Sequence, residues 1–197
     1  MAEKSKGMKT KEKIFEAGVA LFEERGVEKT SVTDIVQKAG VSKGDFYVHY
    51  KSKFSMIEEY VQTLDLNYEE YFQSIPENTP ALETMRMVIR KTAEVLVRNI
   101  GYGVVKNCYA AMLYAKIDSE MVLSYGRSLP LICKKIILKG IRDGEFRSDA
   151  EVDFFVRHLL TAMRGITFEW CISSRNFDLE KEFPLHIELL LEGLKAE

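Results

Sequence analysis

The chain has 197 residues, of which 46% are hydrophobic and 29% charged, a balance that is ordinary for a folded globular protein of one domain or two small ones. With 12 Gly, 4 Pro and 3 Cys, the composition excludes disordered, collagen-like and disulfide-stapled proteins. The formal net charge of −2 by itself indicates no polyanionic partner.

No secretion signal or membrane segment is predicted. The lysine-bearing residues 1–10 are not followed by an apolar stretch, and the longest run without charged side chains, residues 107–115, has nine residues where a membrane span needs about twenty. The cysteines Cys108, Cys133 and Cys171 are far apart and lack CxxC spacing, which indicates neither a disulfide framework nor a zinc site. We therefore expect a cytoplasmic protein without a metal or cofactor.

Apolar residues recur at helical spacing in every long segment, and no run alternates as a strand does, which predicts an all-α fold of about nine helices. Thr79 and Ser148 are expected to cap the fifth and eighth helices, Pro130 to kink the seventh, and the apolar sixth to be a buried strut. Because of Pro184, the sequence pattern does not fix the residue at which the last helix begins. The predicted helices cover approximately residues 10–25, 31–39, 42–50, 53–72, 80–100, 104–117, 119–143 and 149–172, with a ninth ending near residue 194.

Two capping-box patterns stand only eleven residues apart, at Ser31 with Asp34 and at Ser42 with Asp45. Gly40 lies between them, where a tight turn needs a residue that tolerates positive φ. Two short capped helices joined by a glycine turn and preceded by a longer helix are typical of a helix-turn-helix, which places the start of its second helix in the DNA major groove.

The second of these short helices has two distinct faces. Lys43 and Tyr47 are four residues apart and are expected to point outward, whereas Phe46 and Tyr50 are expected to face the supporting helices. The sequence thus predicts one face for DNA and one for the core.

The charge is unevenly distributed along the chain. Residues 29–55 carry five basic and two acidic side chains, net +3, while residues 56–197 carry 17 basic and 22 acidic ones, net −5. Residues 1–28 carry six of each. A solvated lysine-rich face would look similar, but together with the twin-capped turn the basic excess favours phosphate contacts.

The last two predicted helices each have a second apolar face besides the one that a core explains. Two such helices favour a four-helix interface across a two-fold axis, hence a homodimer; the alternative is that other helices of the same chain cover both faces. The predicted dimer-interface residues are Phe154, Thr161, Gly165, Phe168, Ile172, Leu185 and Leu189.

Residues 9–60 resemble, almost position for position, the DNA-binding domain of the TetR family of bacterial transcriptional regulators. The resemblance rests on Ile14, Ala17, Leu21-Phe22, Gly26, Thr30-Ser31-Val32, Asp34-Ile35, Ala39 to Gly44, Phe46-Tyr47, His49-Tyr50 and Ser52-Lys53. It implies a helix-turn-helix domain at residues 9–55 and a helical effector-binding and dimerisation domain at residues 56–197. A small organic effector would then release a homodimeric repressor from a palindromic operator on double-stranded DNA, by resetting the separation of two reading heads.

The resemblance also implies which residues meet DNA. The expected DNA-binding residues are Thr33, Ser42, Lys43, Gly44, Tyr47, His49 and Lys53. Asp45 departs from the hydroxyl residue often found in the family at its position. Since phosphate repels an acid, Asp45 either caps its helix or accepts from cytosine N4.

The effector would bind between the fifth to eighth helices, again by resemblance. Candidate lining residues of mixed aromatic, thioether and amide character favour an uncharged or amphipathic organic ligand; they are Tyr102, Asn107, Met112, Tyr125, Met163 and Trp170. Arg98, Arg127 and Arg164 either hold an anion or are plain surface residues.

Three other functions compete with that of a ligand-released repressor. An enzyme would need a nucleophile or metal constellation, and the three His and three Cys fall at no such spacing, so no enzyme is expected. A helical small-molecule or partner-binding protein without specific operator binding would share the body of the fold. A transcriptional activator would share the DNA-binding head.

Overall fold

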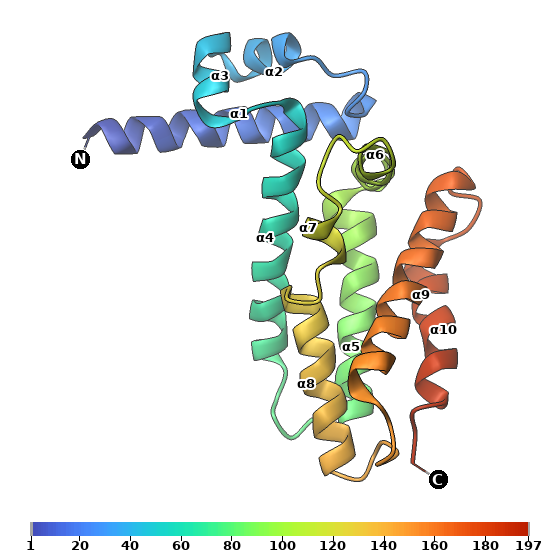
Figure 1. Ribbon diagram of the computed structural model, residues 1–197. Helices are drawn as coiled ribbons and strands as arrows, with labels where there is room; N and C mark the ends of the chain where they lie inside the picture. The colour runs from blue at the N-terminus through green and yellow to red at the C-terminus, as the bar shows by residue number, and fades with distance from the viewer. Residues whose placement is uncertain (1, 197) are drawn as a thin grey trace. The chain divides into compact units, whose positions relative to one another are not determined.

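The computed structural model describes the backbone of residues 2–196 and the side-chain surroundings of residues 7–59, 67–120 and 122–196. This part of the chain forms ten α-helices and one π-helical segment and no strand, apart from an isolated bridge between Phe146 and Lys195 (Figure 1). The all-α prediction is confirmed. The elements are α1 Ala2–Arg25, α2 Val32–Ala39, α3 Lys43–His49, α4 Lys53–Ser74, α5 Ala81–Glu94, the π-helix η1 Val95–Ile100, α6 Tyr102–Leu113, α7 Glu120–Leu123, α8 Ser128–Arg142, α9 Val152–Ile172 and α10 Leu179–Glu192.

The helices form two compact units. Unit 1 comprises Met1–Gln62 and Gly101–Val122, and unit 2 comprises Thr63–Ile100 and Leu123–Glu197. Helix α4 therefore contributes its first part to unit 1 and its second part to unit 2. The units do not follow the expected boundary after residue 55, because α6 groups with the first helices; the functional division at that boundary stays a prediction.

The core of unit 1 forms around the apolar face of α1. Gly18 lies on this face because a Cβ there would come 2.2 Å from Met56 Cε of α4, so the glycine makes room for that side chain. The apolar side chains buried around it are Ile14, Leu21, Phe22, Ile35, Phe46, Met56 and Ile57.

Helix α6 also belongs to unit 1, where it packs against α1. It ends at Leu113 rather than at the predicted residue 117, because Ala115 takes the left-handed conformation at φ +50°. Val104 and Val105 are buried, but Leu113 is 74% exposed. The prediction of a buried strut is therefore wrong for the last turn of α6.

Unit 2 is built on α5, which packs against α8 and α10, while α9 packs against both of these. Arg86 of α5 is paired with Glu188 of α10, and this contact lowers the pKa of the Glu188 carboxyl. The buried apolar side chains at the centre include Met85, Val88, Ile89, Ile132, Ile136, Ile137, Leu159, Met163, Phe183 and Ile187.

The predicted single helix over residues 119–143 is wrong, since the structure has α7 and α8 as separate helices. Pro130 does not kink a helix but occupies the third position of α8. A missing N–H costs nothing there, because the first N–H groups of a helix have no intrahelical partner.

Two predicted caps are also wrong. Pro80, not Thr79, is the N-cap of α5, and the missing side-chain cap comes from the α8–α9 loop: Glu145 accepts from the backbone N–H groups of Ala81 at 2.7 Å and Leu82 at 3.1 Å. Ser148 caps nothing, since α9 begins after Glu151 without a side-chain cap.

Replacing Glu145 with alanine should lower the free energy of unfolding by about 1–3 kcal/mol, because two N–H groups at the positive end of α5 lose a charged acceptor. Glu151→Ala is the matched control, since that carboxylate caps no backbone group. Urea unfolding of both variants measures the difference. Equal loss in the two would show that the Glu145 contact contributes nothing specific.

Candidate functional site

Two capped helices and a glycine turn form the candidate DNA-reading element in unit 1. The capping box of α2 is complete: the Ser31 hydroxyl accepts from the Asp34 N–H at 3.2 Å, and Asp34 accepts from the Ser31 N–H at 2.7 Å. Gly40 ends α2 in the left-handed conformation, at φ +66°. The turn then delivers the chain to Ser42, the N-cap of α3.

Asp45 has a defined structural role in α3. Its carboxylate accepts from the Ser42 N–H at 2.9 Å and from the Ser42 hydroxyl at 2.7 Å, which completes a second capping box. Of the two roles considered for Asp45, capping is the one that the structure shows. The same bonds engage the Ser42 hydroxyl, which also accepts from the Asp45 N–H at 3.1 Å.

The two faces of α3 lie as the sequence predicts. Phe46 and Tyr50 are buried with their ring centroids 5.6 Å apart, whereas Tyr47 is 59% exposed and packs edge-on against Phe46 at 5.4 Å. Burial, and then the neighbouring Glu59, raises the pKa of Tyr50, so that phenol stays neutral. The outward face of α3 thus rests on the buried rings of Phe46 and Tyr50.

The remaining predicted contact residues on α2 and α3 are accessible. Thr33, Lys43 and Gly44 are exposed and His49 is half-buried. Sequence reasoning missed Val48, which is 78% exposed and stands one turn after Gly44 on the same face. An apolar side chain at this position suits contact with the methyl group of thymine. Val48 could have been found from the sequence, because it lies four residues after Gly44 and therefore on the same helix face.

Lys53 is engaged within unit 1. Its ammonium group donates to the carbonyl oxygens of Val27 at 2.6 Å, Thr30 at 3.0 Å and Glu28 at 3.3 Å. These three bonds use all three ammonium donors and tie the start of α4 to the α1–α2 loop. The structure thus gives Lys53 a positioning role, and a phosphate contact would require it to give up at least one of these bonds, so that contact stays a prediction.

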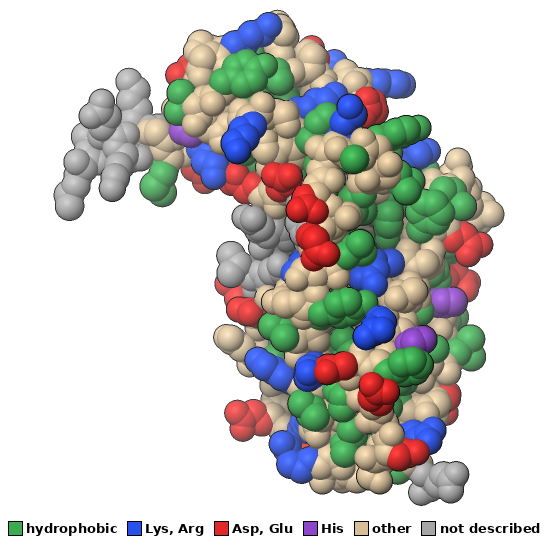
Figure 2. Space-filling model, in the orientation of Figure 1, with side chains coloured by type: hydrophobic (Ala, Val, Ile, Leu, Met, Phe, Trp, Pro, Cys, Tyr) green, Lys and Arg blue, Asp and Glu red, His purple; other side chains and the backbone are tan. Residues whose placement is uncertain are grey.

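The surface formed by α2 and α3 carries basic side chains around a hydrophobic patch, as Figure 2 shows in blue and green. Asp34, the acid at the start of α2, is held by hydrogen bonds from Ser31 and by Arg25 at 3.0 Å, which together lower its pKa. The acidic groups of the motif are thereby occupied in caps. The five lysines of residues 29–55 outweigh these two acids and give the segment its net charge of +3.

Asp34→Asn should lower the melting temperature at neutral pH, by an amount that shrinks as the pH falls through the folded-state pKa of Asp34. The folded-state pKa of Asp34 is depressed, so its stabilisation is present above the unfolded value and is lost as pH falls through the folded value. Melting curves from pH 2 to pH 7 measure this, with Glu151→Gln in unit 2 as a comparison for general charge loss, since Glu151 forms no ion pair with the residues described. A constant offset between variant and parent at every pH would contradict it.

A second candidate surface is the exposed apolar stripe on α9 and α10. Ile172 is 64% exposed and Leu189 is 75% exposed, while the opposite stripe of each helix is buried. The other helices of unit 2 therefore leave these residues uncovered among the residues described, and the dimer interface stays a prediction. The exposed stripe contains every predicted dimer-interface residue: Phe154, Thr161, Gly165, Phe168, Ile172, Leu185 and Leu189.

His158 belongs to the same stripe, although the sequence reasoning missed it. Its ring stacks on Phe154 with centroids 4.0 Å apart, and its Nδ1 lies 2.9 Å from the Phe154 carbonyl oxygen. His158 could have been found from its spacing, because it lies four residues after Phe154 and three before Thr161, on the same helix face.

The predicted effector residues fall in both units. Tyr102, Asn107 and Met112 are half-buried in unit 1, where the Asn107 side chain donates to the Gly103 carbonyl at 2.5 Å. In unit 2, Met163 and Trp170 are buried and Tyr125 is exposed. Because the six residues are divided between the two units, no pocket within one unit can contain them all, and their shared role stays a prediction.

The three arginines considered for an anion are not equivalent. Arg98 is paired with Glu180 through two hydrogen bonds, at 2.6 Å and 3.0 Å. Its guanidinium is therefore committed to α10.

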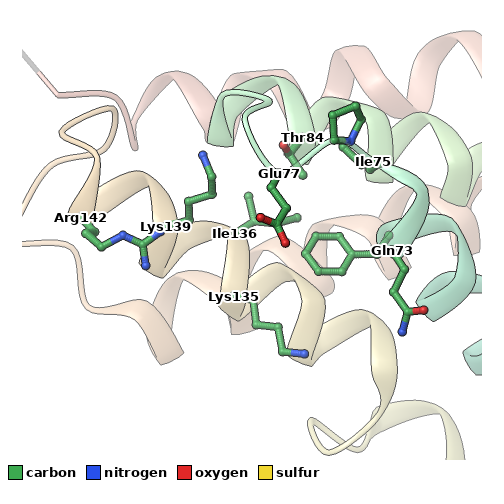
Figure 3. Close-up of a pocket in the computed structure, with 10 residues that line it drawn as sticks. Gln73, Ile75, Glu77, Thr84, Lys135, Ile136, Lys139 and Arg142 are labelled. Carbon is green, nitrogen blue, oxygen red and sulfur yellow. The ribbon is translucent and has the colours of Figure 1, made fainter.

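A pocket that the sequence reasoning missed lies within unit 2, between the end of α4, the α4–α5 loop and α8 (Figure 3). Its volume is about 500 Å³, inside the range of small-molecule sites. The lining residues are Phe72, Gln73, Ile75, Pro76, Glu77, Thr84, Lys135, Ile136, Lys139 and Arg142. None of the predicted effector residues is among them.

The described residues offer little to metal or thiol chemistry. They contain no group of three or more His, Cys, Asp or Glu side chains that would hold a metal ion. Burial raises the pKa of the Cys133 thiol to about 12, which keeps it protonated and unreactive. Nor does any helix among the searched residues combine the length and apolar character that crossing a bilayer requires.

The chain is similar to known regulators along nearly its whole length. The family profile described as "Bacterial regulatory proteins, tetR family" matches residues 14–60, which lie within unit 1. The HTH-type transcriptional repressor KstR2 of Mycolicibacterium smegmatis is 26% identical over 185 residues, covering 93% of this chain and 90% of that protein.

Solved structures share the fold. The Thermus thermophilus repressor FadR in complex with lauroyl-CoA superposes with a TM-score of 0.72 at 25% identity, covering 95% of this chain and 96% of that one. SmeT, the repressor of a Stenotrophomonas maltophilia multidrug efflux pump, gives 0.73 at 21% identity, covering 95% and 91%.

Proposed function

Because the chain belongs to the TetR family of bacterial regulatory proteins, we propose that it works as a homodimeric repressor that a small organic effector releases from a palindromic operator. The observation that carries the proposal is the helix-turn-helix with its reading face exposed, since Lys43 and Tyr47 point outward while Phe46 and Tyr50 are buried. Regulators of this family are generally non-enzymatic, and a repressor acts in the cytoplasm, where the chromosome is.

The DNA contacts follow from the geometry of α3. Lys43, in its first turn, reaches guanine O6 and N7 or a phosphate, and Tyr47 one turn later presents its ring to the groove wall and its hydroxyl to a phosphate. Gly44 lets the DNA backbone come close, and His49 and Thr33 donate to phosphates at the edges of the contact.

The exposed stripe of α9 and α10 supports the dimer. Two such helices from each of two chains form a four-helix interface, in which Thr161 and Gly165 allow a close approach; nothing lies within 4 Å of the position of a Gly165 Cβ. Two-fold symmetry then presents two reading helices to successive major grooves, about 34–36 Å apart.

Operator binding is tested on the DNA that flanks the chain's own gene. We expect a footprint over an inverted repeat, with affinity at least about a thousand-fold above that for random DNA at physiological salt. The measurement is repeated at two salt concentrations, because the phosphate contacts shared by all sequences weaken steeply with salt. Equal affinity for both DNAs would favour a binding protein without operator specificity.

Repression and activation are distinguished by a reporter gene. A reporter behind the footprinted promoter should be expressed more strongly when the chain is absent. A fall in expression would identify an activator instead.

A further inference from the structure

The pocket in unit 2 has one apolar side. The accessible apolar residues of the lining are Phe72, half-buried near the end of α4, and Pro76, exposed in the α4–α5 loop. Ile75 and Ile136 also line the pocket but are themselves buried. The Thr84 hydroxyl is already used, since it donates to the Pro80 carbonyl at 2.9 Å. This side of the pocket therefore suits hydrocarbon.

The other side is cationic. Lys135, Lys139 and Arg142 project from successive turns of α8 and line the pocket along that helix, as Figure 3 shows. Lys139 donates to the Thr79 carbonyl at 3.1 Å and pairs with Asp143 at 2.9 Å, and Arg142 lies 3.2 Å from the same carboxylate. These two cations lower the pKa of Asp143 and are partly neutralised by it.

Lys135 differs from its neighbours. It is exposed and forms no ion pair or hydrogen bond with any residue described, whereas Lys134 beside it pairs with Asp153 at 2.6 Å. An uncommitted ammonium group next to a hydrocarbon surface is a site for a ligand that is both anionic and apolar.

We propose that the pocket between α4, the α4–α5 loop and α8 binds an amphipathic organic anion, with its carboxylate or phosphate group at Lys135 and its hydrocarbon part against Phe72 and Pro76. Lys139 and Arg142 add long-range attraction. Glu77 is the one acid in the lining, and it opposes the bound charge.

The location of the pocket connects it to DNA binding, and this step rests on the proposed function. One wall is the C-terminal end of α4, and the N-terminal end of the same helix is tied by Lys53 to the loop before α2. A ligand that bridges α4 and α8 favours one position of α4 over others. If that position suits the operator poorly, ligand and DNA weaken each other by the same factor.

Binding is measured by isothermal titration with the full chain and four probes. Decanoate and decyl phosphate carry both groups, decanol lacks the charge, and acetate lacks the chain. We expect the two amphipathic anions to bind at least about ten-fold more tightly than decanol or acetate. Their order shows which headgroup the site prefers. Equal binding of decanoate and decanol would overturn the proposal.

Three substitutions of charged residues test whether the ligand binds in this pocket. Lys135→Gln should weaken decanoate binding by about two- to five-fold, and Glu77→Gln should strengthen it by about two- to five-fold. The matched control Lys134→Gln should leave binding unchanged. If Lys135→Gln and Lys134→Gln behave alike, the ligand binds elsewhere and the proposal fails.

Operator release is a separate readout. Decanoate should lower operator affinity in the parent and less so in Lys135→Gln. If the titrations succeed but operator affinity does not change, the effector role is overturned while the site stands. If no operator is bound at all, the proposed function fails and the titrations still decide the site.

Discussion

Replacing Tyr47 with alanine should lower operator affinity by about 30- to 1,000-fold while leaving the dimer and the melting temperature unchanged. Tyr47 is 59% exposed in the centre of α3, so its loss removes little from the core. A tyrosine that packs on the groove wall and donates to a phosphate contributes about 1–2 kcal/mol, and a dimer on a palindrome uses it twice, which gives about 2–4 kcal/mol.

Tyr47→Phe separates the two contributions of this side chain. It keeps the ring and loses the hydroxyl, so its affinity should lie between those of the parent and of Tyr47→Ala. Tyr114→Ala is the control, because Tyr114 is an exposed tyrosine of the same unit outside the helix-turn-helix. Anisotropy with a labelled operator measures affinity, and sedimentation measures the dimer. If Tyr47→Ala splits the dimer or unfolds the chain, α3 has been assigned the wrong outward face.

The helix-turn-helix was predictable because its signals are local. Each capping box lies within four residues, and the conformation of Gly40 is an intrinsic preference of glycine, so Ser31, Asp34, Ser42 and Asp45 form the predicted bonds. The outward position of Tyr47 followed from helical spacing alone.

The wrong predictions concern positions whose contacts come from residues far away in the sequence. Glu145 caps α5 from 64 residues away, and no local pattern around Thr79 and Pro80 reveals it. In the same way, the carbonyl partners of Lys53 lie 23 to 26 residues before it. Sequence spacing finds partners within a few turns, whereas these contacts depend on tertiary packing.

The pocket was missed for a related reason. The spacing of Lys135, Lys139 and Arg142 predicts one cationic helix face, but a charged face is usually only solvated. The α4–α5 loop makes it a site by placing Ile75 and Glu77 opposite that face. The arrangement of loop and helix is a property of the fold that periodicity does not contain.

Replacing Ile172 and Leu189 with aspartate should separate the proposed dimer, raising its dissociation constant by at least about a thousand-fold. Each residue is more than 60% exposed in the single chain, so the change costs the protomer little. In the dimer both carboxylates would enter an apolar interface, and symmetry introduces four charges in all. Burying unpaired charge costs several kcal/mol, which exceeds the 4.1 kcal/mol that a thousand-fold requires.

The same variant tests how operator affinity depends on the dimer. A monomer has one reading helix and loses the gain from linking two, so the affinity for the palindrome should fall towards that for a half-site. Leu138→Asp is the control, because Leu138 is an exposed leucine of unit 2 on α8, outside the stripe. Sedimentation over a concentration series reports the dimer, and circular dichroism reports whether the separated chain stays helical. If the double variant remains dimeric, the chains associate through another surface and the stripe on α9 and α10 serves a different partner. If it separates yet keeps full operator affinity, each chain reads DNA independently and the palindrome is not needed.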